Sequence, residues 1–209
     1  MMLILLAWIE FVFGSFMFSC WLGRMAKVDV RKVGDGNPGA FNLWSAAGYR
    51  LGLTGVALDF LKGYFPLVWI AGQGLEAGYH LTLLAAAPLL GHIFSPFLKF
   101  RGGKGIAVTF GIWSALTGFE ASLVYAILLA CMLGISKLLS RGERGSRISD
   151  EASGLHVVLG MLLLLLYLYV RGFSGPFLLL GLINLILLVF TNRSKLSILL
   201  RRGRVMKNG

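Results

Sequence analysis

Charged residues are scarce in this chain of 209 residues, at 14% of the sequence. A soluble domain carries about 25% charged residues. A soluble globule is therefore excluded, because too little polar surface remains to cover a sequence that is 57% hydrophobic. The same hydrophobicity excludes an intrinsically disordered chain. With a mean hydropathy of +0.79, the composition predicts an all-α integral membrane protein.

Cysteine is nearly absent, which limits the chemistry that the chain can perform. Cys20 and Cys131 both lie within apolar runs, a context that predicts small buried side chains rather than a disulfide or a nucleophile. The three histidines, His80, His92 and His156, are scattered. Since neither zinc spacing nor a Ser-His-Asp arrangement occurs, we expect no metal and assign no residue as catalytic acid, base or nucleophile.

Long apolar runs are what the sequence has in abundance. A membrane span needs about 20 such residues, and we predict seven transmembrane helices, at 2–23, 51–72, 79–98, 105–119, 121–138, 154–170 and 173–190.

The basic residues predict how these helices are oriented. All but two of the 20 Lys and Arg residues lie in the first, third and fifth connections and in the C-terminal segment. Cytoplasmic loops collect Lys and Arg, so the N-terminus is expected outside and the C-terminus in the cytoplasm. The net charge of +11 is then a feature of topology, and we expect no nucleic-acid partner. The single domain would cover 1–209, with cytoplasmic loops at about 24–50, 99–105 and 139–153 and a basic tail at 191–209.

Two of these loops combine glycine with basic residues. The first reads VRKVGDGNPGAFN over 30–42, and the second reads FLKFRGGKG over 97–105. Glycine-rich turns allow backbone amides to surround an anion, and a helix N-terminus favours a phosphate. The pattern indicates a phosphate cradle. Two tight turns whose lysines only reflect the positive-inside rule would have the same sequence pattern. Lys104 is followed by glycine rather than Ser or Thr, so the Walker pattern and nucleotide hydrolysis are excluded.

Three charged residues lie deep within the apolar runs of predicted spans, where charge is costly. Asp59 and Lys62 lie three residues apart, which fits either a mutual ion pair or a lysine directed to a cytoplasmic anion. Glu10 is alone in the first span, facing either the bundle interior or the outer end.

Three motifs resemble those of the bacterial acyl-phosphate:glycerol-3-phosphate acyltransferases. They are the stretch 14–42, the sequence DFLKG at 59–63 and the sequence GHIFSPFLKFRGGKGIA at 91–107. They occur in the family's order and cover the N-terminal half of the chain. That family also has seven spans and a cytoplasmic C-terminus, in agreement with the charge pattern.

The resemblance implies an enzyme of phospholipid synthesis in the bacterial inner membrane, with its active face in the cytoplasm. It would move a fatty acyl chain from acyl phosphate to the sn-1 hydroxyl of glycerol 3-phosphate, giving lysophosphatidic acid and phosphate. No acyl-enzyme, metal or cofactor is implied, and the partners are the two substrates and membrane lipids. The expected phosphate-binding residues are Gly36, Asn37, Gly39, Asn42, Lys62, His92, Lys99, Gly102, Gly103, Lys104 and Gly105.

The chain departs from the family pattern at several positions. Asp35, Phe41 and Ser45 stand where the family usually has Ser, Thr and Arg, and Asn192 and Lys195 fall in a C-terminal motif whose His, Asn and Arg are missing. A carboxylate at an anion site repels phosphate, by roughly 4 kcal/mol at 4 Å and a surface-like dielectric. The nearby basic residues that offer compensation are Arg31, Lys32 and Arg50.

These departures leave three functions open. The first is the family's own reaction. The second is the same fold acting on another acceptor, such as one whose positive group pairs with Asp35. The third is a non-catalytic membrane protein that binds a lipid or a protein partner.

Overall fold

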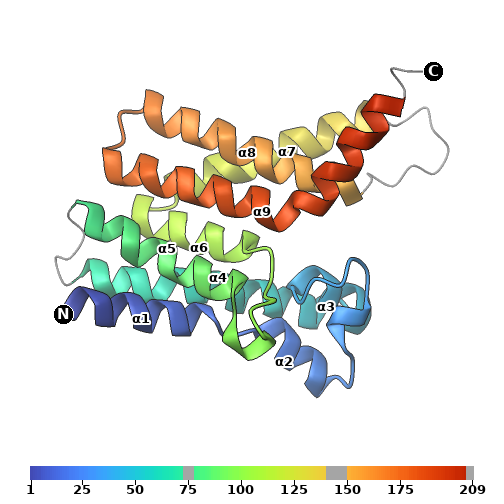
Figure 1. Ribbon diagram of the computed structural model, residues 1–209, viewed down its shortest axis with the longest axis horizontal. Helices are drawn as coiled ribbons and strands as arrows, with labels where there is room; N and C mark the ends of the chain where they lie inside the picture. Colours follow the sequence, from blue (N-terminus) through green and yellow to red (C-terminus); the bar gives the residue numbers. More distant parts are fainter. Residues whose placement is uncertain (73–77, 140–149, 206–209) are drawn as a thin grey trace.

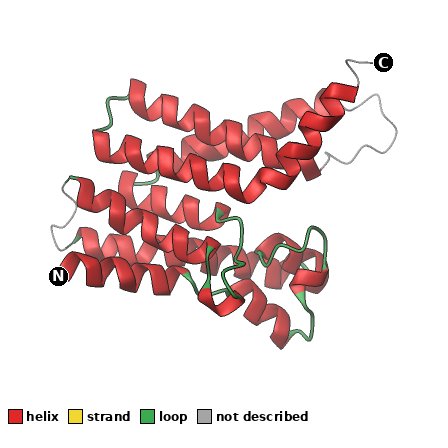
Figure 2. Cartoon of the chain, in the orientation of Figure 1, coloured by secondary structure: helices red, strands yellow, loops and turns green. Residues whose placement is uncertain are grey.

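The computed structural model describes residues 1–72, 78–139 and 150–205, and in this part of the chain every regular element is helical (Figure 2). The α-helices are α1 (Met2–Gly14), α2 (Phe18–Met25), α3 (Ala40–Ala47), α4 (Tyr49–Ala71), α5 (Tyr79–Ile93), α6 (Ile106–Thr117), α7 (Glu120–Leu139), α8 (Asp150–Val170) and α9 (Gly175–Val205). Two short 3-10 helices, η1 (Val30–Lys32) and η2 (Pro96–Leu98), lie in the loops.

The long helices form two groups that lie side by side (Figure 1). The first group holds α1, α4, α5 and α6, and the second holds α7, α8 and α9. Contacts of α5 with α9 and of α6 with α7 join them. The short helices α2 and α3 lie beyond one end of the first group, at the end of the molecule opposite the N-terminus (Figure 1).

Six segments are long and apolar enough to cross a membrane, and α6 is a shorter apolar helix of 12 residues. The prediction of an all-helical membrane protein is therefore confirmed. Large apolar side chains cover much of the surface, including Trp8, Trp69 and Leu166, as expected where lipid replaces water. Cys131 belongs to this surface and is exposed, so its expected burial was wrong. The buried residues of α7 are Ala121, Ser122 and Tyr125, and Val124, Leu128 and Leu129 are partly buried against the core.

Glycines allow the helices of the first group to pack closely. A Cβ at Gly63 on α4 would lie 2.6 Å from the Val108 carbonyl oxygen on α6, and one at Gly111 on α6 would overlap the carbonyl of Phe60 on α4. Gly91 on α5 meets the carbonyl of Phe11 on α1 in the same manner. Small residues are what lets helices approach in lipid, where no hydrophobic force drives them together.

Three predicted boundaries need correction. The first span, expected at 2–23, breaks after Gly14 and resumes at Phe18 as α2; Ser15 caps α1 by donating its hydroxyl to the Phe11 carbonyl at 2.7 Å. The loop expected at 24–50 contains η1 and the whole of α3. The basic tail expected at 191–209 continues α9 as far as Val205.

Of the two other predicted loops, one lies wholly within the described residues. The loop predicted at 99–105 connects η2 to α6 without a regular helix. Most of the loop expected at 139–153 lies outside the described residues.

Candidate functional site

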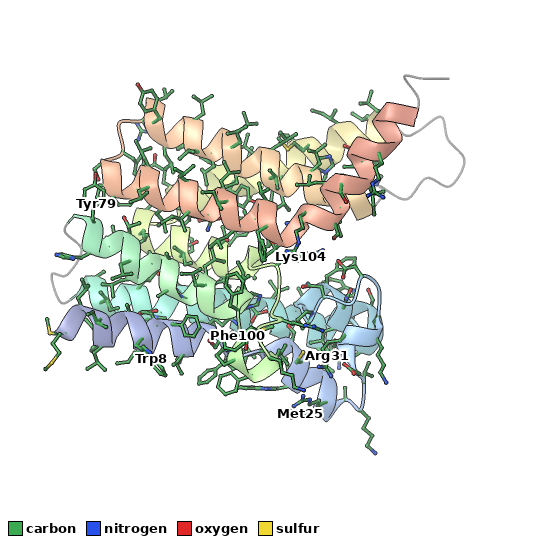
Figure 3. The ribbon with its side chains drawn as sticks, in the orientation of Figure 1. Trp8, Met25, Arg31, Tyr79, Phe100 and Lys104 are labelled. Atoms are coloured by element: carbon green, nitrogen blue, oxygen red, sulfur yellow. The ribbon has the colours of Figure 1, made fainter. Side chains whose placement is uncertain are left out.

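A cavity of about 490 Å³ opens where three separate parts of the chain meet. Residues 35–38, from the loop before α3, form one side, and residues 100–104, from the turn before α6, form the second. The third comes from α9, at residues 190–198. Figure 3 shows Lys104 directed from its turn toward α9. Both glycine-rich loops of the sequence therefore reach one site, and α9 completes it.

The cavity has a polar and an apolar part. Four cationic residues line it: Arg101, Lys104, Arg193 and Lys195. The apolar lining comes from Ile93, Phe94, Phe100, Phe190 and Ile198. Arg193 lies over the Phe190 ring, 4.2 Å from its centroid, and donates to the Phe190 carbonyl oxygen at 2.9 Å. The site therefore offers cations for phosphate beside a surface suited to an alkyl chain.

Asp35 is at the centre of the polar part. Its carboxylate forms an ion pair with Lys104, and Lys195 Nζ lies 3.4 Å from Oδ2. Burial alone would raise the pKa of the Asp35 carboxyl, but Lys104, by hydrogen bond and charge, together with Asn37 and Asn42, holds that pKa well below its usual range. Asp35 is thus ionised and paired with two lysines, which compensate for the repulsion of phosphate expected from this carboxylate.

The compensating cations are not those that the sequence suggested. Arg31 pairs with Asp29 at 3.1 Å on the exposed side of the loop. Neither Arg31 nor Lys32 nor Arg50 lines the cavity. The compensation comes from Lys195, which is 160 positions from Asp35 in the chain and carried by α9. Sequence spacing gave no signal of this pairing.

Asn42 fixes the loop that carries Asp35. Its side-chain nitrogen lies 2.7 Å from the Val33 carbonyl oxygen, 2.9 Å from the Asn37 carbonyl oxygen and 3.1 Å from Asp35 Oδ1. Only 2% of Asn42 is exposed, and it does not line the cavity. Gly36 has φ +74, in the left-handed region that glycine adopts without strain. The loop is therefore built to hold one conformation.

The glycine turn before α6 is closed onto the end of α5. The amide of Gly102 donates to the Ile93 carbonyl at 2.9 Å, and that of Gly103 donates to the His92 carbonyl at 3.1 Å. These two amides are therefore engaged within the protein and do not face a ligand, in contrast to the cradle expected from the sequence. Lys104 follows directly and carries its charge into the cavity.

Behind this turn is a buried polar cluster. Lys62 Nζ lies 2.9 Å from Asp59 Oδ1 and 2.5 Å from the Phe16 carbonyl oxygen, and His92 Nδ1 lies 3.9 Å from Asp59 Oδ1. Each of these three residues is at most 3% exposed. The mutual ion pair, one of the two readings of the sequence, is thus the observed one. Because His92 packs against Gly103, the cluster supports the turn from behind.

The remaining predicted site residues lie apart from the cavity lining. The cavity lining does not include Lys62, His92, Gly39, Lys99 or Gly105. Asn192 is buried on α9 beside the cavity.

Two departures from the family pattern, Phe41 and Ser45, are exposed on α3. Ser45 donates its hydroxyl to the Phe41 carbonyl at 3.2 Å.

Glu10 faces the interior, with 1% of the residue exposed.

Comparison with known proteins identifies the family of the chain. The model of the family described as glycerol-3-phosphate acyltransferase matches residues 4–202. The chain belongs to this family. It is 38% identical to glycerol-3-phosphate acyltransferase 1 of Thermotoga maritima over 170 residues, which is 80% of this chain and 81% of that protein. It is 42% identical to the glycerol-3-phosphate acyltransferase of Leptospira borgpetersenii serovar Hardjo-bovis (strain JB197) over 114 residues, about half of either chain.

Solved structures show the same fold. The crystal structure of PlsY, an integral membrane glycerol 3-phosphate acyltransferase, in its glycerol 3-phosphate form is 27% identical, with a TM-score of 0.80 over 96% of this chain and 93% of that one. Its lysophosphatidic acid form gives a TM-score of 0.79. The family suggested by three motifs in the N-terminal half is thus confirmed over nearly the whole chain.

Proposed function

We propose that the protein is a membrane acyltransferase that moves a fatty acyl chain from acyl phosphate to the sn-1 hydroxyl of glycerol 3-phosphate. The products are lysophosphatidic acid and phosphate, and the pathway is phospholipid synthesis. The observation that carries the proposal is the cavity shared by four cationic residues and an apolar wall, in a chain of the glycerol-3-phosphate acyltransferase family. Both substrates carry phosphate, and one also carries an alkyl chain.

The reaction places modest demands on the protein. Phosphate is a good leaving group, so the site mainly aligns two anions and stabilises the charge that develops during transfer. Lys104, Lys195, Arg101 and Arg193 are assigned to the phosphate groups, with residues 36 and 37 completing the polar wall. The apolar residues between α5 and α9 are assigned to the first carbons of the acyl chain.

We assign a positioning role to Asn42, Lys62, His92, Gly102 and Gly103. They hold the loop before α3 and the turn before α6, as their contacts indicate. Gly39, Lys99 and Gly105 lie in the same two loops outside the cavity lining, and we retain them only as residues that shape these loops.

We assign a topology with seven crossings, the N-terminus outside and the C-terminus in the cytoplasm, within one domain. The six long apolar segments and the shorter α6 supply the crossings. The N-terminus and the C-terminal end of α9 lie at opposite ends of the bundle (Figure 1), and the cavity lies at the end rich in Lys and Arg. The positive-inside rule then gives the cavity a cytoplasmic position in the inner membrane.

An acceptor with a positive group is not favoured. That alternative required Asp35 to face the substrate as a bare carboxylate, whereas two lysines already neutralise it. Four cations around one carboxylate leave a net positive cavity, which suits an anionic acceptor.

The test is phosphate release from palmitoyl phosphate by the purified protein, with and without glycerol 3-phosphate, and with lysophosphatidic acid followed by mass spectrometry. We expect release that depends on glycerol 3-phosphate and is lost in Lys104→Ala. The matched control is Lys32→Ala, which removes an exposed lysine that does not line the cavity. Absence of the product from folded wild-type protein would refute the proposed function.

A further inference from the structure

The two carboxylate oxygens of Asp35 have different surroundings. Oδ1 accepts from the Asn37 backbone amide and from the Asn42 side chain, each at 3.1 Å. Oδ2 is the atom that faces Lys104 and Lys195. The loop therefore fixes one oxygen, while among the described residues the other oxygen contacts two lysine side chains. A substrate phosphate would compete for these lysines.

Asp35 is also the one carboxylate among the described residues that line the cavity, and no histidine is among them. His92 is buried behind Gly103. Attack by a hydroxyl group releases a proton, and a general base must lie within hydrogen-bond reach of that proton. Within the described cavity lining, Asp35 is the carboxylate in that position.

We propose that Asp35 is a catalytic residue whose Oδ2 accepts the proton of the attacking acceptor hydroxyl, after substrate phosphates have drawn Lys104 and Lys195 to themselves. This assignment rests on the proposed function and goes beyond it, since the family pattern has serine at this position.

Substrate binding is what turns the carboxylate into a base. Partial burial would raise the pKa of Asp35, but Lys104 holds it well below its usual range, and such a carboxylate is a poor proton acceptor. Phosphate oxygens compete for the same ammonium protons. When the two lysines turn to phosphate, Asp35 loses its counter-ions and gains anionic neighbours, and both changes raise its pKa. Arg101 and Arg193, the other charged groups of the cavity lining, remain available to the phosphates.

The step balances in atoms and electrons. The hydroxyl oxygen forms a bond to the acyl carbonyl carbon while its O–H bond breaks and the proton passes to Asp35 Oδ2. The bond between the carbonyl carbon and the phosphate oxygen then breaks, and its electron pair leaves with phosphate. The proton subsequently passes from Asp35 to the departing phosphate or to water, which restores the carboxylate.

The test compares Asp35→Asn, Asp35→Ser and Asp35→Glu with the wild type in steady-state transfer from palmitoyl phosphate to glycerol 3-phosphate. A general base contributes about 10²–10⁴-fold, so we expect Asn and Ser to lower kcat by that factor with KM changed only a few-fold. Glu should restore part of kcat. Wild-type kcat should fall on the acidic side of its pH profile, and this limb should be missing in Asp35→Asn. Asp29→Asn is the matched control, because Asp29 lies in the same loop and pairs with Arg31 outside the cavity.

The outcomes separate the two proposals. If the wild type transfers the acyl chain and the kcat of Asp35→Asn and Asp35→Ser is within three-fold of the wild-type value, with the same pH profile, Asp35 is not the general base. The proposed function then still stands. Wild-type protein that makes no lysophosphatidic acid would overturn both. Thermal unfolding identifies a variant that fails to fold, and then the wild-type pH profile decides, since a profile without an acidic limb contradicts the assignment.

Discussion

Replacing Gly103 by alanine tests whether the buried cluster positions the turn before α6. A Cβ at Gly103 would overlap His92 Nε2 and lie 3.0 Å from His92 Cε1, against the 3.4 Å at which ordinary contact begins. The shortest approach is roughly 1 Å inside normal contact. His92 has no room to retreat, because only 3% of it is exposed and its own carbonyl accepts from Gly103. The turn must therefore move, and Lys104 moves with it.

The expected cost follows from that displacement. Overpacking a tight core costs about 1–3 kcal/mol, and a misplacement of about 1 Å at a reacting site costs on the order of 10²-fold in rate. We expect Gly103→Ala to lower kcat/KM about 100-fold in the phosphate-release assay while the protein still unfolds cooperatively. Gly134→Ala on α7 is the matched control, since nothing lies within 4 Å of its added Cβ. A Gly103→Ala enzyme with wild-type kcat/KM would refute the role given to His92.

Three other perturbations follow from the same geometry. Lys195→Met removes a phosphate ligand, and because a charge-assisted contact contributes about 1.5–3 kcal/mol, KM for glycerol 3-phosphate should rise by about 10-fold or more; an unchanged KM would exclude Lys195 from the site. Asp59→Ala leaves Lys62 buried without its partner and should lower stability by about 3–5 kcal/mol, whereas Asp59→Asn with Lys62→Met should recover much of it in denaturant unfolding. The lowered pKa of Asp35 means that its pairing stabilises the fold above the ordinary carboxyl pKa of about 4 and that this contribution is lost as pH falls through the lowered value. The Tm difference between wild type and Asp35→Asn should therefore be constant near neutral pH and shrink in acid; a difference that grows in acid would contradict the assigned direction.

Local pattern was enough to predict the membrane class and most helices. Runs such as 121–138 carry few charges. In lipid the backbone polar groups of such a segment must bond to one another, which favours a helix. The glycine-rich turn at 102–105 was also recognisable, because its residue types are unusual in a membrane loop. The break after Gly14 was not, since the apolar run continues across it. Gly14 lies closely against Pro88 of α5, a contact that the sequence does not reveal.

The site was predictable only in part, because its decisive contacts are remote in sequence. Lys104 and the loop around Asp35 were identified from residue type, whereas their contact depends on how the first helix group packs. Lys195 stood in a motif that had lost its family residues, and its role as counter-ion to Asp35 is visible only once α9 is placed. His92 and Lys62 were expected at the ligand because they fall in motifs that resemble those of the family, yet both are buried behind the turn.

The position of α9 in the chain has a consequence for how the protein is made. Arg193 and Lys195 lie on this helix, which leaves the ribosome after the other described helices. The loop with Asp35 and the turn with Lys104 are synthesised well before it, so the cavity lacks its α9 wall until that helix is added. Until α9 inserts against α5, Lys104 alone neutralises Asp35. A nascent chain that stalls before residue 190 therefore lacks the wall of the cavity that α9 supplies.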